Sequence, residues 1–136
     1  MSTVGLHVDR ELDLTVMTLT GVLEIEQIRH LIRQPEFGTT TRSLWDCRDV
    51  SFANITRDDL AMVAAEQVAL LQQQVTTRTA VVVAEGENGP FSRMYFEMAR
   101  LRFGRDTASF VTTDMEAARK WLYRAASDDD LDAAAE

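Results

Sequence analysis

The residues best suited to chemistry lie in a turn and helix start between positions 86 and 95 of this 136-residue chain. Backbone N–H groups in the first turn of a helix have no intrahelical acceptor, so a small anion could bind there beside a basic side chain. The candidate ligand-binding residues are Asn88, Gly89, Ser92, Arg93 and Tyr95. An ordinary helix start with Pro90 in its first turn explains the same pattern. The Gly86-x-x-Gly89 spacing does not match a phosphate loop, so no nucleotide is inferred.

Elsewhere the sequence contains no catalytic or metal-binding pattern. His7 and His30 are far apart and are expected on the surface, and Cys47 has no second cysteine with which to form a disulfide or a zinc site. The chain also lacks a serine in a glycine elbow and an acidic cluster with metal-site spacing. We therefore expect a protein that is not an enzyme and that uses neither a metal nor a cofactor.

Three charged residues, Asp46, Arg48 and Asp49, follow a predicted central strand. Because α/β folds often bind ligands beyond the ends of their strands, these side chains could take part in a ligand site or, with Tyr95, in an active site. We favour an ion-pair network that stabilises a loop, since no nucleophile or base is identifiable among them.

Hydrophobic periodicity predicts the elements that would position these residues. Residues 4–8 and 14–18 alternate in polarity, which is typical of an antiparallel hairpin. Apolar residues then recur with helical spacing from Ile25 to Ile32, until Pro35 ends the helix. A third strand is predicted at 43–47.

A capping box of Thr56 and Asp59 predicts the start of a long helix. Its inward face is predicted to contain Leu60, Val63, Ala64, Leu71 and Val75. The other predicted segments are a loop at 48–55, strands at 80–83 and 108–111, and helices at 91–103 and 115–125. The order ββαβαβαβα predicts an α/β fold with a mixed five-stranded sheet, in which an N-terminal antiparallel hairpin precedes parallel strands.

The predicted helix 91–103 has a wider apolar surface than a helix that covers one face of a sheet needs. Neighbouring helices could bury all of it. Alternatively, part of it could contact a homodimer partner or an apolar ligand, because aromatic residues, Met and Arg are enriched at interface cores. The candidate interface residues are Phe96, Ala99, Arg100 and Phe103.

Composition indicates one domain, residues 1–126, followed by a disordered acidic tail, residues 127–136. The net charge of −8 repels a phosphate backbone, so we expect no nucleic-acid partner. No run of apolar residues is long enough to span a membrane, and the N-terminus does not resemble a signal peptide. We therefore expect a cytoplasmic protein without membrane insertion.

Several motifs in this order resemble a family of small bacterial proteins related to the STAS domain, the fold of anti-sigma-factor antagonists, which shares features with the CRAL-TRIO lipid-transfer fold. The motifs are Gly21-Val22-Leu23, Glu36-Phe37-Gly38, the segment 44–50, Phe91-Ser92-Arg93-Met94-Tyr95, the segment 110–118 and Trp121-Leu122. The resemblance covers nearly the whole domain and implies a STAS-like fold. Many members of this family have no assigned activity.

In antagonist-type STAS domains, the loop after the central strand carries Asp-Ser-Ser/Thr-Gly, and the first serine is phosphorylated. Here Asn54 replaces the aspartate, Ile55 the phosphoacceptor and Arg57 the glycine, which leaves Thr56 as the matching hydroxyl. Thr56 is the candidate phosphoacceptor, but a helix N-cap is the simpler interpretation of this residue.

The sequence as a whole favours a non-enzymatic STAS-like module that acts through protein association, as a homodimer or with a regulatory protein partner. The alternative is a carrier or sensor of a small apolar or anionic ligand, with a pocket near Ser92 and Arg93.

Overall fold

The chain begins with an antiparallel hairpin, as its alternating sequence predicts. In the computed structural model, which describes residues 2–70, 75–84 and 108–124, β1 (Thr3–Asp9) pairs with β2 (Leu14–Val22). The connecting turn contains Asp13 with φ 52°, a left-handed conformation in which aspartate is enriched. Its carboxylate accepts hydrogen bonds from the backbone N–H of Thr41, at 3.0 Å, and from the Thr41 hydroxyl. These bonds join the hairpin turn to the segment that leads into the third strand.

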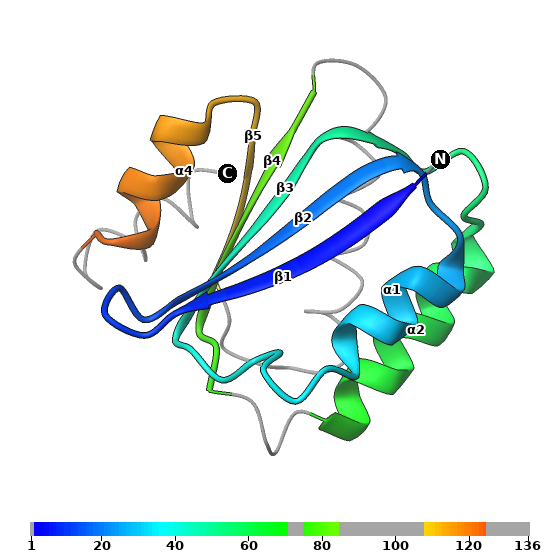
Figure 1. Cartoon of the computed structure of the whole chain (residues 1–136), viewed down its shortest axis with the longest axis horizontal. Coiled ribbons are helices and arrows are strands. Elements are labelled where there is room, and N and C mark those ends of the chain that lie inside the picture. Colours follow the sequence, from blue (N-terminus) through cyan, green and yellow to red (C-terminus); the bar gives the residue numbers. More distant parts are fainter. Residues whose placement is uncertain (1, 71–74, 85–107, 125–136) are drawn as a thin grey trace.

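Three further strands continue the sheet in parallel. They are β3 (Arg42–Ser51), β4 (Arg78–Val83) and β5 (Ala108–Thr112), and the spatial order is β1-β2-β3-β4-β5. β3 lies at the centre, and β1 and β5 lie at the edges of this sheet (Figure 1). The expected α/β fold with a mixed five-stranded sheet is therefore confirmed.

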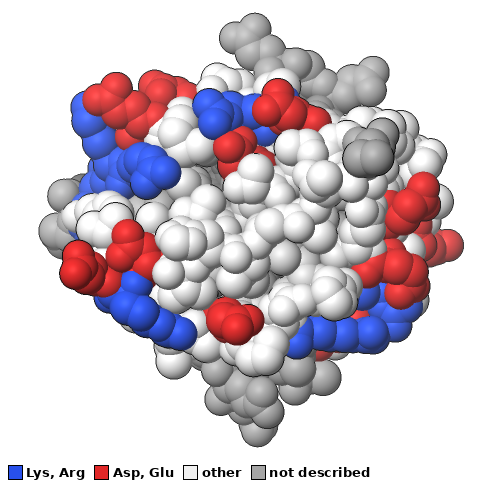
Figure 2. Space-filling view, in the orientation of Figure 1, with Lys and Arg blue, Asp and Glu red and all other residues white. Residues whose placement is uncertain are grey.

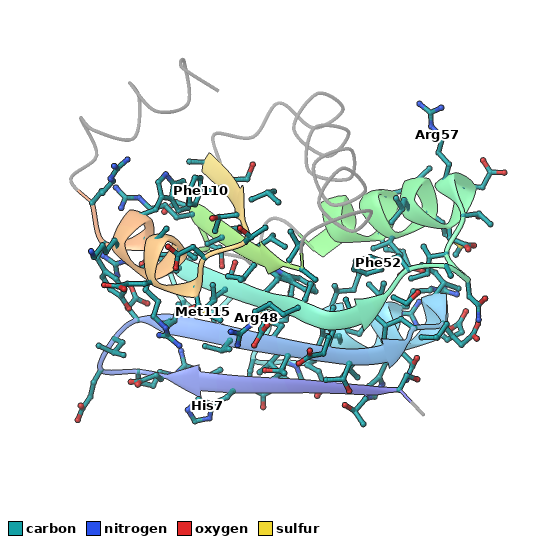
Figure 3. All side chains as sticks on the ribbon, turned by 90° about the horizontal axis from the view of Figure 1, so that it is seen from above. His7, Arg48, Phe52, Arg57, Phe110 and Met115 are labelled. Carbon is teal, nitrogen blue, oxygen red and sulfur yellow. The ribbon has the colours of Figure 1, made fainter. Side chains whose placement is uncertain are left out.

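Helices cover both faces of the sheet. α1 (Ile25–Ile32) and α2 (Arg57–Leu70) lie on one face, and α4 (Met115–Leu122) lies on the other (Figure 1). Because side chains alternate along a strand, β4 contributes to two cores: Val81 and Val83 pack on the α1 and α2 side, and Val82 packs on the α4 side. Figure 3 shows Phe52 on the α2 side of the sheet, and Phe110 and Met115 near α4.

An ion-pair cluster joins α1 to α2. Glu66 of α2 lies 2.6 Å from the guanidinium of Arg29 and 3.0 Å from that of Arg33, and Arg29 also binds Glu26 at 2.7 Å. The hydrogen bond from Arg29 holds the pKa of Glu66 below its usual value, although partial burial opposes this shift. The cluster therefore stabilises the packing of these two helices while Glu66 is ionised.

Two predictions about the elements were wrong. The predicted loop 48–55 begins too early, because residues 48–51 belong to β3, and its last three residues, 49–51, pair with β2. A register shift between Thr18 and Thr20 leaves one extra residue on β3, as in a β-bulge, and this shift interrupts the simple alternation that the sequence analysis used.

Val75 was also placed wrongly, on the inward face of the long helix. Its side chain is 52% exposed, and its backbone N–H donates to the carbonyl of Gly38 at 2.8 Å. Leu60 and Val63 are buried as predicted. Val75 thus lies in the segment that leads into β4, beside the connection between α1 and β3.

Candidate functional site

Most of the predicted site residues lie outside the described part of the chain. They are Asn88, Gly89, Ser92, Arg93, Tyr95, Phe96, Ala99, Arg100 and Phe103, and the tail 127–136 lies outside it as well. The anion site and the apolar helix surface therefore stay predictions. The candidate residues that lie within the described part of the chain are Thr56, Asp46, Arg48 and Asp49.

Thr56 forms a capping box at the start of α2. Its hydroxyl accepts a hydrogen bond from the backbone N–H of Asp59 at 3.1 Å, and its own N–H donates to the Asp59 carboxylate at 2.9 Å. These two bonds satisfy backbone donors that the helix itself leaves without partners. The preceding Ile55, at the position of the usual phosphoacceptor, is buried with 5% of its surface exposed. The geometry supports the interpretation of Thr56 as an N-cap.

Asp46 and Arg48 form a bidentate ion pair within β3. The guanidinium donates from Nε to Oδ1 and from Nη2 to Oδ2, both at 2.9 Å. Residues two apart on a strand face the same side, which brings the two side chains together. The hydrogen bond from Arg48 holds the pKa of Asp46 below its usual value, against the opposing effect of partial burial. Both carboxylate oxygens of Asp46 accept hydrogen bonds from Arg48, which supports the interpretation of these residues as a stabilising ion pair. The pair lies in a strand, however, and not in the loop that was predicted.

Cys47, which lies between Asp46 and Arg48 in the sequence of β3, has a buried side chain. Burial, with a smaller contribution from the charge of Asp46, raises the pKa of its thiol to about 12. A thiol with such a pKa is protonated near neutral pH, and the thiolate is the form that attacks electrophiles and binds metals. Cys47 is therefore part of the core rather than a reactive group.

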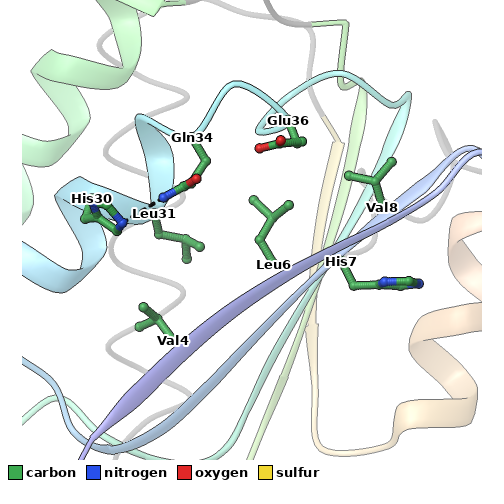
Figure 4. A pocket seen from close by; sticks show the side chains of 8 residues that line it. All are labelled: Val4, Leu6, His7, Val8, His30, Leu31, Gln34 and Glu36. Atoms are coloured by element: carbon green, nitrogen blue, oxygen red, sulfur yellow. Dashed lines mark hydrogen bonds between the residues drawn. The ribbon is translucent and has the colours of Figure 1, made fainter.

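An open groove, which no sequence pattern predicts, lies between β1 and α1. It has a volume of about 450 Å³, and Figure 4 shows the side chains that line it: Val4, Leu6, His7, Val8, His30, Leu31, Gln34 and Glu36. Val4 and Leu6 pack against the buried core, so its floor is apolar. In Figure 2, uncharged side chains occupy most of the centre of the face that carries β1, and charged residues lie mainly around its periphery.

The polar side chains of the groove come mainly from the end of α1 and the turn that follows. His30 and Gln34 lie within hydrogen-bonding distance of each other, at 2.7 Å between Nε2 atoms. Both histidines are exposed, as expected from the sequence. Glu36 is exposed near the Val8 end of the groove (Figure 4), and no described residue forms an ion pair with its carboxylate. Among the described residues that line the groove there is no lysine or arginine.

The described residues provide no metal site and no membrane-spanning helix. Within residues 2–70, 75–84 and 108–124, no three His, Cys, Asp or Glu side chains are grouped so that they could hold a metal ion. In the same ranges no helix combines the length and the apolar character that crossing a membrane requires.

The architecture agrees with the STAS-like α/β fold that the sequence resemblance implies. No protein-family model and no curated protein matches the sequence. Among solved structures, the chain is similar to an uncharacterized protein of the DUF3478 family, with a SpoIIAA-like fold, from Shewanella loihica PV-4. The identity is 18% and the TM-score 0.49, over 89% of this chain and 93% of that one. A likeness at this level assigns neither a family nor a function to the chain.

Proposed function

We propose that this chain is a non-enzymatic regulatory module that binds a protein partner, with β1 and the groove beside it as the contact surface. The observation that carries this proposal is the place of β1 in the sheet. Among the described strands β1 pairs with β2 alone, so its outer edge presents backbone N–H and C=O groups that no other described strand uses. Such an edge is a template to which an extended segment can add as a further strand.

The groove supplies the second half of such a contact. Val4, Leu6 and Val8 recur at every second position of β1 and line the groove together. In strand addition, main-chain hydrogen bonds provide affinity, and pockets for alternate side chains provide specificity. An edge strand beside a groove with an apolar floor offers both.

The described polar residues that were candidates for chemistry are consistent with the same proposal. The Thr56 hydroxyl caps α2, both oxygens of Asp46 accept hydrogen bonds from Arg48, and the Cys47 thiol is buried. Each of these groups therefore has a role in stabilising the fold.

Self-association is a further part of the proposal. Two surfaces could form the contact between two copies. One consists of the predicted interface residues of helix 91–103, and the other is the outer face of α2, where Met62 is 39% exposed. Replacing both Phe96 and Phe103 with Asp should convert a dimer into folded monomers. Wholesale unfolding would instead show that these residues belong to the core.

A second candidate function, carriage of a small apolar ligand, is favoured by the size of the groove. Its volume of about 450 Å³ lies within the range of about 300–1,000 Å³ that is usual for ligand sites. Native mass spectrometry of the freshly purified protein would detect a retained ligand as added mass. A ligand that binds the folded state should also raise the melting temperature.

The protein-binding proposal is tested with a phage-displayed library of random ten-residue peptides selected on the immobilised full chain. Leu6→Lys places a charge in the groove, and its neighbour Gly5→Lys places the same charge on the opposite face of β1, where an added Cβ meets no atom within 4 Å. We expect selected peptides to bind the Gly5→Lys variant normally and the Leu6→Lys variant at least tenfold more weakly, with both variants folded by thermal melting. Equal binding to both variants would contradict the proposal.

A further inference from the structure

We propose that the partner segment is a cationic extended peptide, which adds to β1 as a strand, places aliphatic side chains in the groove at alternate positions and carries Lys or Arg beside Glu36. This inference rests on the proposed function and names the chemistry of the partner. It follows from the spacing of the apolar residues, from the position of Glu36, whose carboxylate has no ion-pair partner among the described residues, and from the charge of the chain.

The apolar side chains of the groove set the pattern of the peptide. Residues two apart on a strand are separated by roughly 6.6–6.8 Å, so Val4, Leu6 and Val8 form a row with that repeat on the groove side of β1. A strand added to β1 would lie about 4.8 Å away and present its own side chains with the same repeat. Aliphatic residues at every second position of the peptide would then pack beside this row.

The charge of the groove selects a basic residue. Glu36 lies near the Val8 end, exposed and without an ion-pair partner among the described residues. Arg10 of the hairpin reaches the same turn, but its guanidinium donates to the carbonyl of Thr39 at 3.4 Å. No described residue that lines the groove is a lysine or arginine, and the chain carries a net charge of −8, so an acidic peptide would be repelled and a basic one attracted.

A second copy of this chain fits the apolar row less well than such a peptide, because of charge. If β1 of another copy paired antiparallel with β1, it would bring Thr3 and Val4 toward the Val8 end and offer no basic residue of the strand to Glu36. The observations therefore favour a basic partner over self-pairing at this edge.

The test uses the same random ten-residue library, followed by fluorescence anisotropy with the most enriched peptide in synthetic, labelled form. We expect enriched sequences to carry aliphatic residues at alternate positions together with Lys or Arg. The exposed position of Glu36 limits its contribution, so Glu36→Gln should weaken binding about threefold and Glu36→Lys about tenfold. The matched control is Glu116→Gln on α4, which removes the same charge from the opposite face of the sheet and should leave the affinity unchanged.

The possible outcomes separate this inference from the proposed function. Peptides that lose binding to Leu6→Lys but are acidic or neutral, or are indifferent to Glu36→Lys, would overturn the cationic partner and leave the contact surface in place. A homodimer in native mass spectrometry that Leu6→Lys dissociates would make a second copy the occupant and also overturn it. Failure to enrich any peptide, or equal binding to Leu6→Lys and Gly5→Lys, would overturn both.

Discussion

Replacing Thr56 with alanine tests whether this hydroxyl is a structural cap. In the structure its oxygen accepts from the backbone N–H of Asp59 at 3.1 Å, and alanine would leave that N–H without its protein acceptor. Loss of such an N-cap typically costs about 1 kcal/mol of folding free energy. For a chain of this size, that corresponds to a fall of about 4 °C in melting temperature. The reciprocal bond from the Thr56 N–H to the Asp59 carboxylate, at 2.9 Å, would survive in Thr56→Ala.

The assay is thermal unfolding by circular dichroism, with urea unfolding to obtain the free energy. Thr56→Ser keeps the accepting oxygen and should melt within about 1 °C of the original chain, since serine caps at least as well as threonine. Thr56→Val keeps the β-branched shape without the oxygen and should behave like alanine. Asp59→Ala removes the other bond of the capping box and should be destabilising by itself.

The reasoning would be refuted if Thr56→Ala left the melting temperature unchanged, or if serine were as destabilising as alanine. Either result would mean that the capping bond does not contribute to stability. The Thr56 hydroxyl would then be free for another role, and the phosphoacceptor interpretation would regain its place.

Three other predictions follow from the described contacts. Gly5→Val should stabilise the fold by about 0.5–1 kcal/mol in urea unfolding, because a side chain at this open strand position meets no atom within 4 Å and valine favours strands; destabilisation would show that β1 needs the glycine. The pKa of Glu66 is lowered by Arg29 and Arg33, so its contribution is present above its usual pKa of 4.5 and is lost as the pH falls below that value. Glu66→Gln should therefore reduce the fall in the free energy of unfolding as the pH is lowered below 4.5. An unchanged fall would contradict a stabilising role of the ion pairs. The pKa of Cys47 is raised from 9.0 to about 12, so its contribution is complete below pH 9.0 and is lost as the pH rises toward about 12. Iodoacetamide should modify Cys47 near pH 8 only when urea unfolds the chain, and rapid modification of the folded protein would contradict its burial.

The sequence predicts the sheet well where one face of a strand is buried. Alternation in residues 4–8 and 14–18 is sufficient for the hairpin, because a strand with one buried face must repeat every two residues. Helical spacing from Ile25 to Ile32 predicts α1, which ends at Ile32, three residues before Pro35. The parallel pairing of β2, β3 and β4 follows from the helices between them, since a parallel connection requires a long crossover.

The end of β3 was predicted less well, and the reason is local. The register shift between β2 and β3 interrupts the period of two, so the charged residues after Asp46 resemble a loop. If the predicted strand had included these charged residues, the spacing of Asp46 and Arg48 would have placed both side chains on the same face of the strand. Their opposite charges would then have predicted an ion pair.

The groove could not be predicted because it depends on the order of the strands. Val4, Leu6 and Val8 would alternate in the same way if β1 were an interior strand. The edge position arises because β3, β4 and β5 all add on the far side of β2. Likewise, Glu36 comes near β1 only through the turn after α1, a relation that no local pattern encodes.

The most direct test of the contact surface is amide hydrogen exchange of the full chain with and without the most enriched peptide. Slowed exchange in residues 3–9 of β1 and in α1, with unchanged exchange in α4, is the expected result, because an added strand would bond the edge of β1 that no other described strand uses. Protection confined to α4 or to other segments, with residues 3–9 unchanged, would contradict the central claim that β1 and its groove bind the partner.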